Sequence, residues 1–322
     1  MKPRVFVTRR WPQEVERILE ERFDVTLNLD DRPLGDDEIA EAFLAYDAIL
    51  PTVSDRLPAA LFRHPRTRTR IIGNFGVGYN HIDIEAARQA GIAVTNTPGV
   101  LTDCTADLTL ALMLMVSRRA GEGERQLRSG AWQGWSPTHM MGTAMHGKTL
   151  GIVGMGRIGK AVARRARFGF GMTINFFNRS RLDDEDTRAL GAAQVDSLET
   201  LMETCDFVSL HCPGGGGNRN LVNAARLGLM KPTAFLINTA RGDVVDEAAL
   251  IAALQDRTIA GAGLDVYAAE PMVPAELKAM ENVVLLPHLG SATRETRIAM
   301  GMKVIENIAA FFEGEEPPDR VA

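Results

Sequence analysis

Residues 149–168 read TLGIVGMGRIGKAVARRARF, which joins a short apolar run, three glycines and a stretch with helical spacing. The glycines follow the pattern G-x-G-x-x-G directly after the apolar run. In a strand–turn–helix unit the first glycine makes the tight turn, the second lets a ligand approach the backbone, and the third lets the helix pack on the strand. A glycine string alone is weak evidence, but this order of strand, glycines and helix predicts a βαβ unit in a parallel sheet.

Short apolar runs alternate with helix-length segments on both sides of this turn. Strands separated by helices form parallel sheets with helices on both faces, so the sequence predicts an α/β protein with two doubly wound sheets. Helical spacing is clear at 11–22, 36–44 and 294–312. The predicted strands are 4–8, 23–27, 48–50, 71–73, 92–95, 149–153, 172–177, 206–210, 234–238, 261–265 and 283–286.

The chain length favours two domains. A single core stops growing beyond roughly 250–300 residues, and this chain has 322. We expect one domain to comprise residues 1–99 and 288–322, and the other to comprise residues 100–287. The final helix is expected to return to the first domain, because the sheet that begins after residue 100 is complete by residue 287.

Charge and cysteine content exclude several classes of protein. A net charge of -5 argues against a broad surface for nucleic acid or an anionic membrane. The most apolar stretch, 108–116, is far shorter than the roughly 20 residues that span a bilayer. No secretory or transit segment is evident at the start. The three cysteines, Cys104, Cys205 and Cys212, lack metal-ligand spacing and fit reduced thiols in the cytoplasm. We therefore expect no metal site.

The glycine turn predicts a dinucleotide site. The backbone of the turn can approach a pyrophosphate, and the N-terminus of the following helix offers free N–H groups and a partial positive charge. The residues predicted to line this part of the site are Gly154, Met155, Gly156, Arg157, Ile158 and Gly159.

The stretch INFFNRSR (174–181) indicates which dinucleotide is preferred. An acid about 20 residues beyond the motif binds the adenosine ribose in NAD sites, but Asn178 stands 19 residues after Gly159. Asn178 is neutral, and Arg179 and Ser180 can donate hydrogen bonds to a 2′-phosphate. Each charge-assisted bond would stabilise the complex by on the order of 1.5–3 kcal/mol. The sequence thus predicts a preference for NADP(H), with NAD(H) as a second cofactor. The alternative is that Arg179 and Arg181 are solvated loop charges.

Three segments after predicted strands carry groups suited to one reaction. They are INTARGD (237–243), LDVYAAEP (264–271) and LPHLGSAT (286–293). The carboxyl ends of parallel strands lie at the same edge of a sheet, where ligands bind. An Arg could pair with the carboxylate of a 2-oxo acid and polarise its carbonyl, while a His held by a carboxylate supplies a proton as hydride arrives.

With these segments the chain resembles the D-isomer-specific 2-hydroxyacid dehydrogenases, and most closely the glyoxylate/hydroxypyruvate reductases. The resemblance rests on NFGVGYN (74–80), NTPGVLTD (96–103), GMGRIG (154–159), NTARG (238–242), DVYAAEP (265–271) and PHLGSAT (287–293). It implies a Rossmann cofactor domain at 100–287, a flavodoxin-like substrate-binding domain formed by 1–99 and 288–322, and an active site in the cleft between them. It also implies a homodimer and small 2-oxo acids such as glyoxylate and hydroxypyruvate as substrates.

Carried over to this sequence, the resemblance makes Arg241 the ligand of the substrate carboxylate and carbonyl, His288 the general acid/base and Glu270 its partner. The backbone N–H groups of Val77 and Gly78 are expected to bind the substrate carboxylate. Asp265 is expected near the nicotinamide carboxamide. The remaining residues expected to line the cofactor site are Thr105, Cys212, Pro213, Asn218, Thr239, Ala240, Arg241, His288 and Gly290.

Several alternatives stay open. The run GGGGN (214–218) departs from the family pattern and puts the contact assigned to Asn218 in doubt. Trp135 either closes a partner's substrate pocket or only buries interface area. Other candidate functions are a D-2-hydroxyacid dehydrogenase for bulkier 2-oxo acids and a dinucleotide-sensing corepressor that binds peptides. The other five histidines, His64, His81, His139, His146 and His211, are expected to have loop or core roles.

Overall fold

The computed structural model describes residues 2–182 and 185–322. These residues form two compact units, each built on its own sheet. The first unit contains the described residues up to Leu101 together with Ala292–Ala322, and the second is Thr102–Ser291. No helix within the described ranges is both long enough and apolar enough to cross a membrane.

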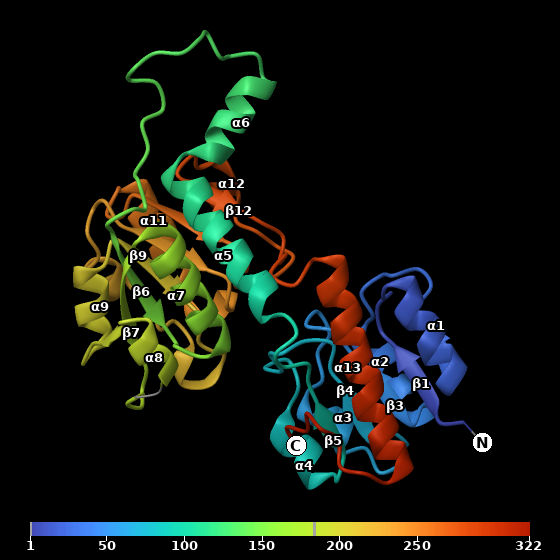
Figure 1. The fold of residues 1–322 in the computed structure, drawn as a ribbon. Coiled ribbons are helices and arrows are strands. Elements are labelled where there is room, and N and C mark those ends of the chain that lie inside the picture. The colour runs from blue at the N-terminus through green and yellow to red at the C-terminus, as the bar shows by residue number, and fades with distance from the viewer. Residues whose placement is uncertain (1, 183–184) are drawn as a thin grey trace. The chain divides into compact units, whose positions relative to one another are not determined.

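The first unit is a five-stranded parallel sheet with the order β2-β1-β3-β4-β5 (Figure 1). This order is the doubly wound, flavodoxin-like one. Its strands are β1 (Arg4–Val7), β2 (Asp24–Leu27), β3 (Ala48–Leu50), β4 (Ile71–Gly73) and β5 (Ala93–Thr95). Its helices are α1 (Gln13–Arg22), α2 (Asp36–Ala45), α3 (Ala59–Phe62), α4 (Ile84–Gln89) and α13 (Arg294–Glu313).

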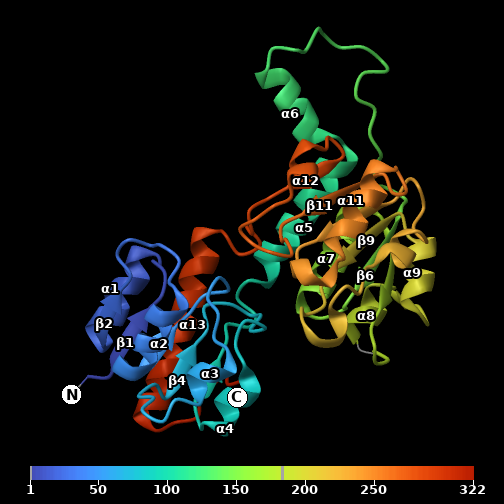
Figure 2. The same cartoon turned by 180° about the vertical axis from the view of Figure 1, so that it is seen from behind.

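Helices cover both faces of this sheet. Ile49, Ile72 and Val94 are buried in one apolar cluster with residues of α2, α3 and α4. The last helix, α13, packs against β4 and α1, and both views show it beside these elements (Figures 1 and 2). The hydroxyl of Thr293 caps the start of α13, and Gly314 ends it with a left-handed φ of 84°. The final helix therefore belongs to the first unit.

The second unit is a seven-stranded parallel sheet with the order β12-β11-β10-β9-β6-β7-β8. The strand order reverses at β6, which lies between β9 and β7, so ligands are expected at its carboxyl end. The strands are β6 (Thr149–Val153), β7 (Thr173–Phe177), β8 (Ala193–Gln194), β9 (Phe207–Leu210), β10 (Phe235–Asn238), β11 (Gly261–Leu264) and β12 (Val283–Leu285). The helices are α5 (Thr102–Ser117), α6 (Ala120–Arg128), α7 (Arg157–Phe170), α8 (Glu185–Ala189), α9 (Leu198–Thr204), α10 (Ala224–Leu227), α11 (Glu247–Gln255) and α12 (Ala275–Ala279).

This sheet also lies between two helical layers. Apolar residues of α5 and α7 form one cluster with strand residues such as Ile152 and Phe235. Residues of α9, α10 and α11 form a second cluster with strand residues such as Val208 and Leu236. The apolar stretch 108–116 lies in α5, where Leu112 is fully buried. Burying each large apolar side chain contributes about 1.5–3 kcal/mol, which accounts for that stretch without a membrane.

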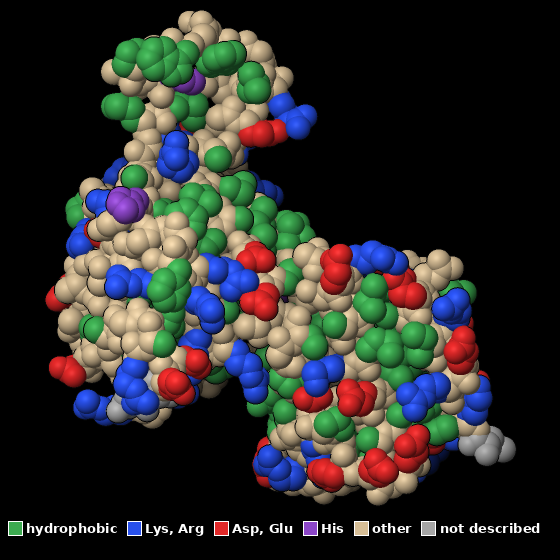
Figure 3. Space-filling model, in the orientation of Figure 1, with side chains coloured by type: hydrophobic (Ala, Val, Ile, Leu, Met, Phe, Trp, Pro, Cys, Tyr) green, Lys and Arg blue, Asp and Glu red, His purple; other side chains and the backbone are tan. Residues whose placement is uncertain are grey.

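One segment of the second unit projects from the rest of that unit. It runs from α6 to the start of β6 and appears in green in Figures 1 and 2. Four large apolar side chains on it are exposed, and Figure 3 shows apolar groups gathered at its end. They are Leu127, Trp132, Trp135 and Met141.

The predicted fold class, two doubly wound parallel sheets, is confirmed. Two details differ from the prediction. The edge strand β8 has only two residues and no apolar run, so its sequence gave no strand signal. Residues 288–291 group with the second unit and not with the final helix. The physical reason is their hydrogen bonding: the backbone N–H groups of Leu289 and Gly290 donate to Asp265, and Thr105 donates to Gly290 O.

Candidate active site

The three segments predicted to carry the catalytic groups follow three neighbouring strands. Arg241 comes after β10, Glu270 after β11 and His288 after β12, and these strands are adjacent in the order β12-β11-β10. Since all three strands are parallel, their carboxyl ends lie at one edge of the sheet. The fold therefore brings the three segments to the same edge within one unit.

His288 and Glu270 form a direct pair. The distance between His288 Nδ1 and Glu270 Oε2 is 2.8 Å, and about a third of each side chain is exposed. A carboxylate can only accept, so His288 Nδ1 carries the hydrogen and Nε2 stays available for a substrate. The other oxygen of Glu270, Oε1, accepts from the backbone N–H of Tyr267 at 3.0 Å. Both oxygens of Glu270 are thus used to orient the imidazole.

Glu270 is held in its charged form. Burial raises the pKa of Glu270, but the hydrogen bond and charge of His288, the Tyr267 N–H and the charge of Arg241 outweigh burial. The pKa of Glu270 therefore lies below its usual value, and the carboxylate stays ionised through the neutral range.

His288 has a strained backbone. Its φ is 56°, in the left-handed region that few residues other than glycine adopt. The backbone N–H of His288 donates to Asp265 O at 2.9 Å, which helps to hold this conformation. Strain of this kind costs on the order of 1–3 kcal/mol and is common at functional sites. This backbone conformation fixes the direction in which the imidazole side chain leaves the backbone.

Arg241 lies half-buried beside this pair. Burial lowers the pKa of Arg241, while the nearby charges of Glu270 and Asp243 raise it. The guanidinium stays protonated in any case. One of its nitrogens donates to Ala240 O at 2.7 Å. A guanidinium that is partly shielded from water can bind a carboxylate more strongly than an exposed one, since the attraction between the charges is less screened.

A close backbone approach sets the position of Arg241. A methyl group on Gly242 would lie 1.9 Å from the carbonyl carbon of Tyr267, so only glycine fits there. The turn after β10 consequently packs directly on the turn after β11. Asn238 shapes the first of these turns, because its side chain donates to Arg241 O and accepts from the N–H of Ala240.

Asp265 is fully buried at the end of β11. Its carboxylate accepts from the N–H groups of Leu289 at 2.6 Å and Gly290 at 2.8 Å. Burial raises the pKa of Asp265 above its usual value in spite of these bonds. Thr105, at the start of α5, donates to Gly290 O at 2.9 Å. Thr105, Asp265 and Gly290 thus form one bonded group, and its contact with a nicotinamide remains a prediction.

The glycine turn has the geometry that the sequence predicted. Gly154 has a φ of 95°, which favours glycine. A methyl group on Gly159 would lie 2.4 Å from Gly154 O, so the helix α7 packs closely on the turn. Space around Gly156 is open, with no atom within 4 Å of a methyl group placed there. The backbone at Gly156 and the first N–H groups of α7 can therefore receive a pyrophosphate.

The side chain of Asn178 supports this turn. Its Oδ1 accepts from the N–H of Met155 at 2.8 Å, which leaves the amide nitrogen for a ligand. Arg179 and Ser180 are exposed beside it. Gln194 holds the same loop, because it donates to Ser180 O and accepts from the N–H of Leu182. The sequence gave no signal for Gln194, which lies in the short edge strand.

The glycine run 214–217 is anchored at two points. Asn218 donates to Pro213 O at 2.9 Å, so its amide closes the loop. The carboxylate of Asp243 accepts from the N–H of Gly215 at 2.7 Å. Asp243 also carries charge beside Arg241 and was missed by the sequence reasoning, although it lies in the same RGD segment. It connects the glycine run to the turn that holds Arg241.

The other residues predicted to bind the cofactor lie at the carboxyl ends of β6, β9 and β10 or on α7. Burial raises the pKa of Cys212 to about 11, so it is a neutral thiol. The hydroxyls of Thr239 and Thr109 are 2.9 Å apart. His211 pairs with Ser209 at 2.8 Å, and burial lowers its pKa to about 3, which makes it a neutral core histidine as predicted. Met155 and Gly159 are buried, Ile158 and Ala240 are half-buried, and Arg157 and Pro213 are exposed.

Three further residues predicted to bind the substrate belong to other segments of the chain. Val77 and Gly78 are in the loop after β4 of the first unit, where they are half-buried. Trp135 is on the projecting segment of the second unit and is 81% exposed. Their part in substrate binding remains a prediction.

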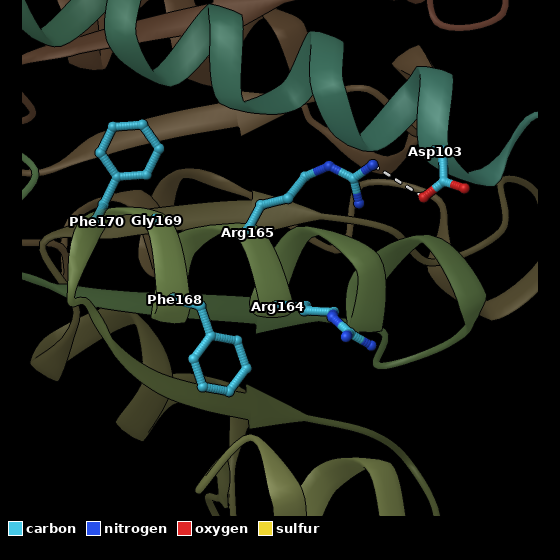
Figure 4. A pocket seen from close by; sticks show the side chains of 6 residues that line it. All are labelled: Asp103, Arg164, Arg165, Phe168, Gly169 and Phe170. Atoms are coloured by element: carbon cyan, nitrogen blue, oxygen red, sulfur yellow. Dashed lines mark hydrogen bonds and ion pairs between the residues drawn. The ribbon is translucent and has the colours of Figure 1, made fainter.

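A hollow of about 630 Å³ lies elsewhere, on α7. Figure 4 shows Arg165 on α7 reaching Asp103 of α5, with Phe168 further along the helix. None of the predicted site residues lines it. Within the described residues, no group of three or more His, Cys, Asp or Glu side chains could hold a metal ion.

The chain is similar to known proteins along its whole length. It is 46% identical over 325 residues to a glyoxylate reductase from Thermococcus litoralis, covering 100% of this chain and 97% of that protein. It is 46% identical to a glyoxylate reductase from Korarchaeum cryptofilum, covering 100% and 96%. Among solved structures, it superposes with a TM-score of 0.87 and 36% identity on an NADPH-dependent glyoxylate/hydroxypyruvate reductase from Sinorhizobium meliloti in complex with NADP and malonate, covering 100% and 97%.

One family model matches more than half of the chain. Residues 110–290 match the model described as D-isomer specific 2-hydroxyacid dehydrogenase, NAD binding domain. That range contains the glycine turn, Arg241, Glu270 and His288. The chain therefore belongs to the D-isomer-specific 2-hydroxyacid dehydrogenases, a family of NAD(P)-dependent oxidoreductases with a Rossmann fold.

Proposed function

We propose that the chain reduces small 2-oxo acids, glyoxylate and hydroxypyruvate first among them, to 2-hydroxy acids, with NADPH preferred over NADH. The observation that carries this proposal is the pair of His288 and Glu270 with the guanidinium of Arg241 beside it. This set contains an acid that can give one proton and a cation that can bind one carboxylate.

The residues divide the work of the reaction between them. A bound nicotinamide cofactor would supply the hydride to the carbonyl carbon. Arg241 pairs with the substrate carboxylate and polarises the carbonyl, and His288 Nε2 gives its proton to the carbonyl oxygen. The product is the 2-hydroxy acid, and His288 is left neutral on its Glu270 partner. Further carboxylate donors in this proposal are the N–H groups of Val77 and Gly78.

The structure offers a fitting place for the dinucleotide. The open backbone at Gly156 and the start of α7 suit the pyrophosphate. Asp265, which follows β11 in the same sheet and is bonded to Gly290, is the proposed partner of the nicotinamide amide. The remaining cofactor contacts that we propose are those of Thr105, Cys212, Pro213, Asn218, Thr239, Ala240 and Gly290.

The choice of substrates rests on the names of the relatives. Two relatives are named glyoxylate reductase, and the solved structure from Sinorhizobium meliloti is named glyoxylate/hydroxypyruvate reductase. NADPH oxidation should be followed with glyoxylate, hydroxypyruvate, and branched and aromatic 2-oxo acids. The proposal expects the highest kcat/KM with one of the two small acids. A higher kcat/KM with the bulkier acids would make the chain a different D-2-hydroxyacid dehydrogenase, and no turnover at all would favour a binding protein.

The NADPH preference rests on Arg179. Replacing Arg179 by Ala is expected to lower kcat/KM for NADPH about 10- to 100-fold, because one charge-assisted bond to the 2′-phosphate is worth on the order of 1.5–3 kcal/mol. The value for NADH should change little, since NADH lacks that phosphate. Steady-state rates with both cofactors test this, and Arg181→Ala is the matched control, since Arg181 is exposed in the same loop. Equal losses for both cofactors would remove the assignment.

We further propose a homodimer in the cytoplasm, supported by the exposed apolar side chains on the projecting segment and the three free cysteines. In this proposal Trp135 contacts the substrate of a second copy. Trp135→Ala is then expected to raise KM for glyoxylate about two- to tenfold, as the loss of one aromatic contact implies. Sedimentation would show whether the dimer persists. An unchanged KM in an intact dimer would leave Trp135 with no role in the pocket.

A further inference from the structure

The loop after β4 has an unusual set of hydrogen bonds to its carbonyl groups. Asn74 is fully buried, and its Nδ2 donates to Gly76 O at 3.0 Å and to Gly78 O at 3.1 Å. Nδ2 of the buried Asn96 donates to Val77 O at 2.8 Å. Two buried amide side chains thus hold three successive carbonyl groups of this loop.

Holding a carbonyl also fixes the next N–H group. In a planar trans peptide the C=O of one residue and the N–H of the next point in opposite directions. Asn74, bonded to Gly76 O, therefore directs the N–H of Val77 away from itself. Asn96, bonded to Val77 O, directs the N–H of Gly78 away in the same manner.

These two N–H groups are available to a ligand. Within the described parts of the chain, neither the N–H of Val77 nor that of Gly78 donates a hydrogen bond, although the neighbouring N–H groups of Phe75 and Gly76 donate to Pro51 O and Asn74 O. Both residues are half-buried, so the groups are partly shielded from water. Adjacent, partly desolvated N–H groups form a small anion site.

His81 orients the first amide. Its Nε2 is 3.0 Å from Asn74 Oδ1. Because Asn74 uses its nitrogen to donate to two carbonyls, its oxygen must accept, and Nε2 of His81 must carry the hydrogen. A flipped amide would place its oxygen against Gly76 O and Gly78 O. His81 therefore selects the amide orientation that the loop needs.

We infer that Asn74, Asn96 and His81 are positioning residues that fix the N–H groups of Val77 and Gly78 for the carboxylate of the 2-oxo acid. This inference rests on the proposed function. It assigns substrate affinity to three side chains that need not touch the substrate, and it gives His81 a role beyond that of an ordinary loop residue.

The experiment replaces each amide by a residue of similar size that cannot donate. Asn74→Leu and Asn96→Leu are expected to raise KM for glyoxylate at least about tenfold, since each frees one peptide to rotate away from the carboxylate. The kcat should change less, and the dissociation constant for NADPH should stay as in the unaltered enzyme. Asn74→Asp should raise KM as well. If only the Asp variant raises KM, the effect is charge repulsion and the inference is wrong.

Asn28 supplies the matched control. It lies in the same unit, and its Nδ2 also donates to two backbone carbonyls, Thr8 O and Arg32 O, each at 2.8 Å. Asn28→Leu should lower the thermal midpoint without raising KM for glyoxylate. A rise in KM equal to that of Asn74→Leu would show a general loss of structure and overturn the inference.

A pair of His81 variants tests the inference should Asn74→Leu fail to fold. Gln can donate to Asn74 Oδ1, whereas Phe cannot. His81→Phe is expected to raise KM for glyoxylate, and His81→Gln to restore much of the affinity. Equal KM values for the two would overturn the role of His81. Turnover of glyoxylate by the unaltered enzyme distinguishes a failure of the proposed function from a failure of this inference. No turnover refutes the proposed function. Turnover with an unchanged KM in the variants refutes only this inference.

Discussion

Replacing His288 by Asn is expected to lower kcat/KM for glyoxylate about 10²- to 10⁴-fold, the range that one positioned general acid contributes. Asn has no group in the place of Nε2, so no proton reaches the carbonyl oxygen. The effect should fall on kcat, because the carboxylate of the substrate is bound by other groups. Steady-state kinetics with saturating NADPH measure it.

Asn is the suitable replacement for two reasons. His288 has a φ of 56°, and Asn tolerates that region better than most residues. The Asn side chain can also donate to Glu270 in place of Nδ1. Backbone and carboxylate are therefore preserved, and only the distal nitrogen is lost. His146→Asn, at an exposed residue outside the site, is the control. A His288→Asn enzyme with near-normal kcat would refute the assignment of the acid.

Glu270→Gln complements this variant. The carboxylate of Glu270 accepts from His288 Nδ1 at 2.8 Å and keeps its charge there. Gln has a similar shape, but it cannot offer a negative charge to the imidazolium that the proposed reaction uses. The kcat for glyoxylate should therefore fall at least about tenfold, as the loss of one charge-assisted bond implies. Steady-state kinetics measure it, and an unchanged kcat would mean that Glu270 acts only through geometry.

The fold was predictable because its signals are local. Nearly all strands are short apolar runs, and period-two or helical spacing within about ten residues is enough to find them. The two-residue strand β8 has no such pattern and was missed. The grouping of residues 288–291 was also missed, because it depends on bonds from Asp265 and Thr105, which are far away in the sequence.

The meeting of the three segments of the proposed site was predictable from the fold. Arg241, Glu270 and His288 follow adjacent parallel strands, so topology alone brings their segments together. The residues that hold the surrounding loops could not be found in this way. Asn96, Gln194 and Asp243 bond to the backbone of other loops, and Asn74 bonds to the backbone of its own loop. A short polar side chain gives the same signal whether it does this or is solvated.

Replacing Arg241 by Ala is expected to lower kcat/KM for glyoxylate about 10²- to 10⁴-fold. Two charge-assisted bonds, to the carboxylate and to the carbonyl oxygen, would be lost at on the order of 1.5–3 kcal/mol each. Because the proposed function gives the guanidinium contacts with both groups, KM should rise and kcat should fall. Lys in its place keeps the charge but not the planar pair of donors, so Arg241→Lys should recover only part of the loss.

A loss of kcat/KM in Arg241→Ala has a second possible cause, which must be distinguished from the loss of direct contact with the substrate. Arg241 also contributes to the lowered pKa of Glu270, so its loss could act through the His288–Glu270 pair. Added guanidinium ion distinguishes the two, because a free cation that enters the Ala cavity restores a carboxylate ligand directly. Rescue that raises kcat/KM with glyoxylate supports direct contact. Arg226→Ala, which breaks the pair with Glu199 elsewhere in the unit, should show neither the loss nor the rescue. Arg241→Ala should also be measured in the Glu270→Gln enzyme. If it then causes no further loss of kcat/KM, Arg241 acts through Glu270 and is a positioning residue.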